Sequence, residues 1–315
     1  MNQLEPNSVD VLINVFGKPY QTALSLLSLL RHCDRHIRRI YFQEEALTAE
    51  YEKRGHADIL DYLGARVVHH IPRYWIGSDP LDEERARQDA EYRLSVRYQH
   101  GWENCTASRA LIIHNDIYVH GDIIAALDAG LGEHTGIGQI GQCWWCPAGQ
   151  TGRCAPDRYR EFKPSYTYLM RLYNQDMDYT KRRAYNLGLR AEFHRQAWPL
   201  PECRLNEWVA YVNMDKARPD TQPLGAGALF GAFYASGAKI GVNWDRPVNL
   251  DTAVMWFHDL NNLGHTFRHY PIAELVRHDK TGRDNLEAPE KYIKAEYRAL
   301  ARLKEEFPEF AAGLQ

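Results

Sequence analysis

RALIIHNDIYVHGDII, residues Arg109 to Ile124, is the stretch that decides the fold. Its apolar run, Ala110 to Ile113, is typical of a strand buried on both faces, as strands of parallel sheets are. The run ends at the polar triplet His114-Asn115-Asp116. Ligands of open α/β sheets bind beyond the carboxyl ends of the strands, and a carboxylate there suits a hard divalent cation that bridges to phosphate. Asp116 is therefore a candidate metal ligand; the alternative is a polar turn after a core strand.

The residues around this strand alternate between strand and helix patterns. Strand patterns occupy residues 9–15, 37–42 and 65–71. Helix patterns occupy residues 20–32, 48–63, 79–99 and 123–131. This alternation predicts an α/β fold with a mainly parallel sheet and right-handed crossovers.

The composition is that of an ordinary globular protein, with 44% hydrophobic and 25% charged residues among 315. The net charge of −3 argues against a general nucleic-acid binder. The first ten residues lack the basic and apolar regions of a signal peptide, and the uncharged stretch 223–238 is too short to cross a bilayer. We therefore expect a cytoplasmic protein without a transmembrane segment. Peripheral contact with the inner membrane, through the basic cluster 181–183, is left open.

The character of the sequence changes after Gly138. Residues 138–205 are rich in Cys, Tyr and basic side chains, and they predict an insertion or subdomain. Beyond it, a strand is expected over residues 252–257, ending at His258, and an amphipathic helix over residues 289–306.

A nucleotide-diphosphate site in such a fold needs a group for the ribose or base and a metal ligand. Glu44 or Glu45, at the end of the second strand, suits the first role, and His258 could join Asp116 in the second. Asn115 and the arginines Arg93 and Arg97, on the helix before the central strand, are further donor-binding candidates. The alternatives are a solvated helix start for the glutamates, a hydrogen-bonded strand-end histidine, and a solvated helix face for the arginines.

Four cysteines carry a second metal signal. Cys143 and Cys146 are spaced as two ligands of one tetrahedral ion, and Cys154 and Cys203 can complete a four-thiolate shell. Such a shell selects zinc or iron–sulfur, and zinc is preferred in the absence of a redox motif. Because a complete shell leaves no open position, this zinc would be structural. Buried thiols and a redox CxxC pair are the alternatives.

Three stretches carry a resemblance to a known family, namely residues 9–30 (VDVLINVFGKPYQTALSLLSLL), 40–45 (IYFQEE) and 110–124 (ALIIHNDIYVHGDII). They resemble the nucleotide-binding half of GT-A fold glycosyltransferases, closest to the family 2 pattern. The resemblance implies a Rossmann-related, mixed, mainly parallel sheet flanked by helices. In that family an Asp-x-Asp motif ends the central strand and holds the metal; here the motif is degenerate, since only Asp116 matches.

The resemblance also implies roles for later residues. Asn206-Glu207-Trp208 is similar to the helix start that carries the general base of an inverting transfer, and His258 resembles the late histidine that completes the metal site. A positioned carboxylate can accept the proton of a sugar hydroxyl. Burial beside Trp208 would raise the pKa of Glu207, whereas Arg204 would lower it. The alternative for Glu207 is a surface helix residue.

The implied enzyme is a hexosyltransferase-type glycosyltransferase that moves a sugar from a UDP- or GDP-linked donor to an acceptor hydroxyl, with Mn²⁺ or Mg²⁺ at the donor site. The acceptor would be a glycan, a lipid-linked group or another hydroxyl compound. We expect one compact unit: residues 1–137 bind the nucleotide sugar, residues 138–278 bind the acceptor and carry the insertion, and residues 279–315 form a helical tail.

Two other functions stay open. One is a catalytically silent nucleotide-sugar-binding protein that has lost the first Asp of the motif. The other is a nucleotidyltransferase on the same fold, which would need a basic loop after the first strand. Lys18 is the only cation in that loop, and this counts against the second alternative.

Overall fold

The structure, a computed structural model, describes residues 8–45, 56–144, 146–165, 168, 172, 185–186, 203–240, 247–279 and 288–314. The strands are β1 Val9–Val15, β2 Ile37–Glu44, β3 Val67–His70, β4 Arg109–His114, β5 Ile117–Val119, β6 Gly136–Ile140, β7 Tyr185–Asn186, β8 Leu205–Asn213, β9 Tyr234–Ile240, β10 Pro247–Leu250, β11 Phe267–His269 and β12 Val276–His278. The helices are α1 Pro19–Cys33, α2 Ala57–Leu63, α3 Glu83–Gln88, α4 Ala90–Leu94, α5 Gln99–Asn104, α6 Ile123–Leu131, α7 Pro147–Gln150, α10 Met214–Thr221, α11 Val254–Asn262, α13 Pro289–Glu306 and α14 Pro308–Ala311. Single 3₁₀ turns cover Asp34–His36, Gly64–Arg66, Pro156–Arg158 and Ile272–Glu274.

The core is a seven-stranded sheet in the order β11-β6-β8-β4-β1-β2-β3. β1 pairs in parallel with β2 and β4, β2 with β3, and β6 with β11, whereas β8 runs antiparallel to both β4 and β6. The sheet is therefore mixed and mainly parallel, which confirms the predicted fold class. β4 lies at its centre with residues 110–113 buried, as its apolar run predicts.

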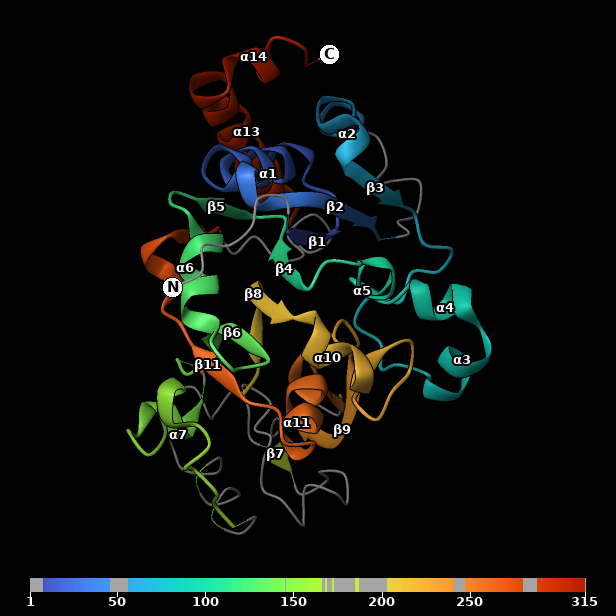
Figure 1. Cartoon of the computed structure of the whole chain (residues 1–315), viewed down its shortest axis with the longest axis vertical. Coiled ribbons are helices and arrows are strands. Elements are labelled where there is room, and N and C mark those ends of the chain that lie inside the picture. Colours follow the sequence, from blue (N-terminus) through green and yellow to red (C-terminus); the bar gives the residue numbers. More distant parts are fainter. Residues whose placement is uncertain are drawn as a thin grey trace.

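Helices cover both faces of the sheet. One face packs against α1, α2, α6 and α13 through alternate residues of the strands, such as Val11, Ile13 and Leu111. The other face packs against α5, α10 and α11 through the residues between them, such as Leu12 and Ile112. Figure 1 shows α1 and α13 together on the side of β1 and β2 that is away from α10 and α11. This alternation follows from the two-residue period of strand side chains.

Two smaller sheets lie at the edges of the core, in the order β10-β9-β7 and as the pair β12-β5. β12 runs antiparallel to β5, and its last residue, His278, pairs with Ile117. A histidine near the C-terminus is thereby placed next to the end of β4.

The predicted long helix over residues 79–99 is wrong. The chain forms three short helices instead, because two residues leave helical geometry. Asp89 is extended and caps α4 by accepting a hydrogen bond from Tyr92 N, and Tyr98 adopts a left-handed conformation with φ of 62°. For the helix predicted over 48–63, the structure describes only the part from residue 56, where α2 begins at Ala57.

The predicted strand over residues 252–257 is also wrong, because Ala253 turns the chain (φ 65°) and α11 begins at Val254. Residues Val254 to His258 are all buried, so the apolar run has no polar face to reveal its helical period. A third correction concerns Glu207, which lies in strand β8 and not at a helix start.

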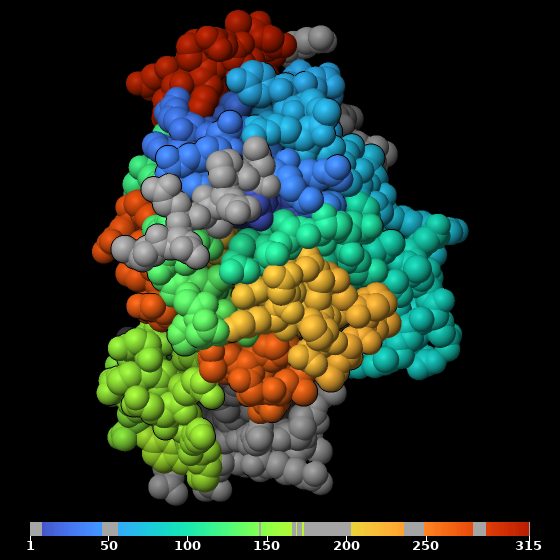
Figure 2. Space-filling model, viewed as in Figure 1, coloured from blue at the N-terminus to red at the C-terminus, as the bar shows by residue number. Residues whose placement is uncertain are grey.

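The C-terminal helices pack against the first third of the chain. Tyr62 of α2 and Phe310 of α14 make an edge-to-face contact with ring centroids 5.3 Å apart. Figure 2 shows α13 and α14, in red, at one end of the molecule beside α2. Among the described residues, no helix is both long enough and apolar enough to span a membrane.

Candidate active site

A cleft of about 570 Å³ opens at the carboxyl ends of β1, β2 and β4. Residues from both halves of the chain line it: Asn14, Phe16, Lys18, Glu45, Ser78, Arg97, Tyr98, His114, Asn115, Asp116, Gln142, Trp144, Arg204, Glu207, Trp208, Phe233, Asp251, Thr252 and His278. Its position is the one expected for a ligand site in an open α/β sheet.

Asp116 lies at the bottom of this cleft and is 3% exposed. Lys18 Nζ is 2.8 Å from its Oδ2, while His278 Nε2 is 3.1 Å and His114 Nδ1 is 3.7 Å from its Oδ1. Asn115 turns away from Asp116, and its Nδ2 donates hydrogen bonds to Gly17 O and Thr22 Oγ1. The central carboxylate thus has an ammonium on one oxygen and two imidazoles on the other.

These contacts set the charges of the group. Burial would raise the pKa of Asp116, but the charge of Lys18 and the hydrogen bonds of both histidines outweigh it and hold that pKa well below its ordinary value. Burial would lower the pKa of His114, but its contacts with Asp116 and Glu207 prevail and raise it. At His278 burial prevails, and its pKa is lowered. Asp116 is therefore ionised and His278 favours the neutral, metal-ligating form.

The donor set of this cluster fits a divalent ion. Ligand atoms of His114, Asp116 and His278 all lie within 4.8 Å of one another. The two imidazole nitrogens, His114 Nδ1 and His278 Nε2, are only 3.2 Å apart and face the same carboxylate oxygen. Mg²⁺ takes oxygen ligands, so two imidazole nitrogens and one carboxylate favour a divalent transition ion over Mg²⁺.

Glu207 lies next to this cluster because of the register of β8. Val209 pairs with Ile113, so the antiparallel strand carries Glu207 past the carboxyl end of β4. Its Oε1 is 3.5 Å from His114 Nε2 and 3.3 Å from Arg204 Nη2. Arg204, which is 2% exposed, also reaches Asp251 Oδ2 at 2.8 Å. One buried guanidinium therefore holds two carboxylates of the cleft.

Burial and the charge of Arg204 have opposite effects on the pKa of Glu207, and these contacts decide which effect prevails. Burial would raise the pKa of Glu207, but the charge of Arg204 and the contact with His114 lower it to about 2. Glu207 is therefore ionised at neutral pH.

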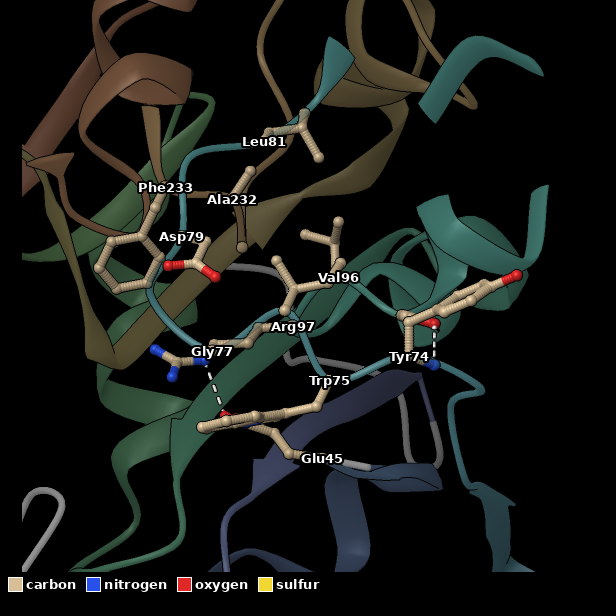
Figure 3. A pocket seen from close by; sticks show the side chains of 13 residues that line it. Glu45, Tyr74, Trp75, Gly77, Asp79, Leu81, Val96, Arg97, Ala232 and Phe233 are labelled. Carbon is tan, nitrogen blue, oxygen red and sulfur yellow. Dashed lines mark hydrogen bonds and ion pairs between the residues drawn. The ribbon is translucent and has the colours of Figure 1, made fainter. Parts of the chain in front are cut away.

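A second group of cleft residues surrounds the Glu45 carboxylate. Its Oε1 accepts hydrogen bonds from Asn14 Nδ2 (2.9 Å) and Arg97 Nε (2.8 Å), and its Oε2 accepts one from Trp75 Nε1 (3.2 Å). Figure 3 shows Arg97 joined to Glu45, with the Trp75 ring beside the carboxylate. The Arg97 guanidinium carbon also lies 5.1 Å from the centre of the Phe233 ring. This part of the cleft combines aromatic faces, a cation and an anion, as sites for small molecules commonly do.

Three residues predicted for the donor site, Glu44, Arg93 and His258, lie outside the cleft lining. Glu44 contacts His56 and His69, because it ends β2 on the opposite side from Glu45. Arg93 is held by Glu103 at 2.8 Å. His258, placed in α11 and contacting Asp259 at 3.1 Å, lines a separate cavity with Met255. The histidine that lies with His114 and Asp116 is therefore His278, and His258 is not among the residues that line this cleft.

Lys18, His114, His278 and Asp251 are among the cleft residues to which the sequence assigned no binding or catalytic role. His114 occupies the position of the first Asp of the family motif, which was the available signal. His278 ends the short run Val276–His278 just as His114 ends β4. No local pattern marks Lys18 or Asp251, because both reach the cleft through tertiary packing.

A stack of aromatic rings extends from the histidine cluster to the cleft edge. The Trp208 ring lies on His278 with centroids 4.3 Å apart and planes within 9°. Trp144 stacks on Trp208 at 5.3 Å, and it is 40% exposed. The exposed ring of Trp144 offers a flat apolar surface in the same cleft as Glu207. Trp145, which follows Trp144 and precedes Cys146, lies outside the described residues.

Three of the four predicted zinc ligands flank the short helix α7 along the chain: Cys143 and Cys146 before it and Cys154 after it. Cys146 N donates to Cys143 O at 3.3 Å, Cys154 N donates to Ala148 O at 3.1 Å, and both Cys146 and Cys203 are buried. Within the described part of the chain, three or more metal-ligating atoms converge within 4.8 Å only at the His114 cluster. Structural zinc therefore stays a prediction.

We expect elemental analysis of the purified protein to find about one zinc ion per chain, because four thiolates form a closed tetrahedral shell. The Cys143→Ser plus Cys146→Ser variant should lose this zinc. The matched control, Cys33→Ser, should keep it, because Cys33 is a buried thiol at the end of α1. Zinc-free protein from zinc-supplemented cultures would contradict the prediction.

Comparison with known proteins gives matches only among solved structures. No family model and no curated protein matches the chain. The mannosyltransferase PcManGT from Pyrobaculum calidifontis, in complex with GDP-Man and Mn²⁺, aligns at 10% identity and a TM-score of 0.40, covering 84% of this chain and 56% of that one. The galactosyltransferase LgtC, in complex with donor and acceptor sugar analogs, aligns at 12% identity and a TM-score of 0.34, covering 66% of this chain and 59% of that one.

TarS from S. aureus (residues 1–349) aligns at 9% identity and a TM-score of 0.30, covering 42% of this chain and 35% of that one. The chain thus spans between about a third and three fifths of the length of these neighbours. Similarity at this level identifies no family, so the function is argued from the residues of the cleft.

Proposed function

We propose that this protein transfers a sugar from a nucleotide-diphosphate donor to an acceptor hydroxyl, with a divalent ion at the donor site. The observation that carries the proposal is the convergence of Asp116, His114 and His278 in one cleft with a second buried carboxylate, Glu207. Residues that can hold a metal ion suit the departure of a diphosphate, and a separate carboxylate can accept the proton of the attacking hydroxyl.

The donor would lie along the cleft from Glu45 to Asp116. The aromatic and charged groups at Glu45, Arg97 and Phe233 support placing the nucleoside there. The diphosphate would then reach His114, Asp116 and His278, the side chains that would hold the ion. When bound, that ion would neutralise the negative charge that develops on the departing diphosphate.

The acceptor would enter on the other side, beside Glu207 and the exposed ring of Trp144. Its hydroxyl oxygen would attack the anomeric carbon, the bond from that carbon to the diphosphate oxygen would break, and Glu207 would take the hydroxyl proton. Attack from the side opposite the diphosphate makes the proposed transfer inverting. A glycan acceptor is favoured, since aromatic faces pack well against the apolar faces of sugar rings.

The low pKa of Glu207 bears on this role. A carboxylate with a pKa of about 2 is a weak base in the free protein. We propose that Arg204 turns more fully towards Asp251, its second partner at 2.8 Å, when substrates fill the cleft. Glu207 would then lose part of the charge contact that lowers its pKa.

Calorimetry with UDP and GDP, with and without Mn²⁺, tests the donor site. We expect at least one of them to bind with a dissociation constant in the micromolar range in the presence of Mn²⁺. The His278→Gln variant should weaken Mn²⁺ binding by roughly 10-fold or more, because it removes one nitrogen ligand. The matched His258→Gln variant should bind Mn²⁺ as the wild type does, because His258 lies in a separate cavity.

Two results would contradict this proposal. Equal loss of Mn²⁺ affinity in both histidine variants would mean that His278 is not a ligand. Failure of the wild-type protein to bind either nucleotide with Mn²⁺ would remove the donor site altogether. Nucleotide binding without turnover of any nucleotide sugar would instead favour the silent binding protein.

A further inference from the structure

Lys18 combines two features that are individually rare. It is a non-glycine residue in a left-handed conformation, with φ of 60° and ψ of 54°. Its ammonium is also buried, with 4% of the side chain exposed, at 2.8 Å from Asp116 Oδ2. Such a backbone conformation costs energy and persists only where the surroundings enforce it, which is most common at functional sites.

The surroundings of Lys18 do enforce it. Its N–H donates to the hydroxyl of Tyr292 on α13 at 3.3 Å, and its carbonyl accepts from Thr22 N at 2.8 Å. The carbonyl of Gly17, one residue earlier, contacts Asn115 Nδ2 at 3.2 Å and His56 Nε2 at 3.1 Å. The turn between β1 and α1 is therefore tied to three separate parts of the chain.

The N-terminus of α1 is not the anion site of this turn, although helix N-termini often bind phosphate. Glu296 of α13 already accepts hydrogen bonds from the Tyr20 N–H at 2.8 Å and the Gln21 N–H at 3.2 Å. The positive end of the helix is thus met by a carboxylate of the protein itself. The charge that this turn offers to the cleft is the Lys18 ammonium.

The two oxygens of Asp116 contact different groups. Lys18 contacts Oδ2, whereas both imidazoles face Oδ1. A divalent ion on the imidazole side could therefore share Asp116 without displacing the ammonium. Lys18 lines the cleft, and a lysine ammonium is a compact point charge well suited to phosphate oxygens.

We infer that Lys18 is a fixed cation of the donor site, which binds the diphosphate directly so that donor nucleotides bind even without a divalent ion. This inference rests on the proposed function. Tyr292 and Glu296 act as positioning residues, because they hold the turn that places the ammonium. The same ammonium competes electrostatically with a free divalent ion for Asp116.

Two binding measurements on the whole protein test this role. The first is calorimetry of UDP and GDP in EDTA, where the wild type should bind and Lys18→Met should bind about 10- to 100-fold more weakly, the loss expected for one charge-assisted contact. The second is Mn²⁺ binding without nucleotide, measured by electron paramagnetic resonance. Here Lys18→Met should bind Mn²⁺ more tightly than the wild type, because the change removes a positive charge 2.8 Å from the carboxylate that would bind the ion.

The opposite signs of the two effects separate this role from a merely structural ion pair, whose loss would weaken both. Lys294→Met, an exposed lysine of α13, is the matched control and should change neither measurement. If Lys18→Met does not fold, Tyr292→Phe replaces it; this variant should weaken nucleotide binding in EDTA several-fold, and unchanged binding would overturn the inference.

Failure of this inference is distinguishable from failure of the proposed function. If the wild-type protein binds UDP or GDP with Mn²⁺ but not in EDTA, the role of Lys18 is overturned and the proposed function stands. Wild-type protein that binds neither nucleotide under either condition overturns both.

Discussion

Replacement of Asp116 by asparagine should lower kcat/KM for sugar transfer by roughly 10²- to 10³-fold, the usual loss when one preorganised electrostatic group of an active site is removed. Asparagine keeps the shape of the side chain but removes the charge that faces His114, His278 and Lys18. Binding of Mn²⁺ should weaken in parallel. Steady-state kinetics over a panel of UDP- and GDP-sugars, together with Mn²⁺ titration, measures both effects.

The control for this variant is Asp58→Asn, which removes an exposed carboxylate at the start of α2. Asp58→Asn should keep wild-type kinetics. Because Asp116→Asn leaves the buried Lys18 ammonium without its partner, its thermal unfolding should also be recorded. A folded Asp116→Asn protein with wild-type turnover would refute the proposed donor site.

Replacement of Glu207 by glutamine should lower kcat by roughly 10²- to 10⁴-fold, the range for loss of a positioned general base. The affinity for nucleotide and Mn²⁺ should change little, because in the described part of the chain Glu207 contacts the proposed metal ligands through His114, at 3.5 Å. Single-turnover kinetics and calorimetry separate the two effects. The expected pattern differs from that of Asp116→Asn, in which binding and turnover fall together.

Asp251→Asn is the matched comparison for Glu207→Gln, since both carboxylates contact Arg204. It should lower kcat less, because Asp251 is proposed to hold Arg204 and not to accept the proton. A larger loss in Asp251→Asn than in Glu207→Gln would assign the base to Asp251.

The sequence was most informative where local pattern alone determines structure. The apolar run before His114 specifies a buried central strand. The carboxyl end of such a strand lies at the edge of the sheet where ligands of open α/β folds bind. Asp116 was predicted on this basis, and it lies in the cleft. The same reasoning placed Glu45 at the end of β2, although it could not distinguish Glu45 from Glu44.

Local pattern failed where tertiary pairing decides. His258 follows the apolar run of residues 253–257 and His278 follows Val276-Arg277, but the first segment is a helix in which residues 254–258 are all buried, whereas the second is a strand paired with β5. Only that long-range pairing brings His278 to Asp116. Lys18 is the only cation in the loop after the first strand, yet its position depends on Tyr292, 274 residues later in the chain.

The reversed direction of β8 has a further consequence for the way the cleft is built. A strand that runs against its neighbours starts at the edge where they finish, so the beginning of β8 and the residue just before it contribute Arg204, Glu207 and Trp208 to the cleft. The ladder from Val209 to Asn213 fixes the register of these residues on the sheet. In the proposed transferase, the start of this strand would therefore shape the site, and the rest of the strand would hold that start in place.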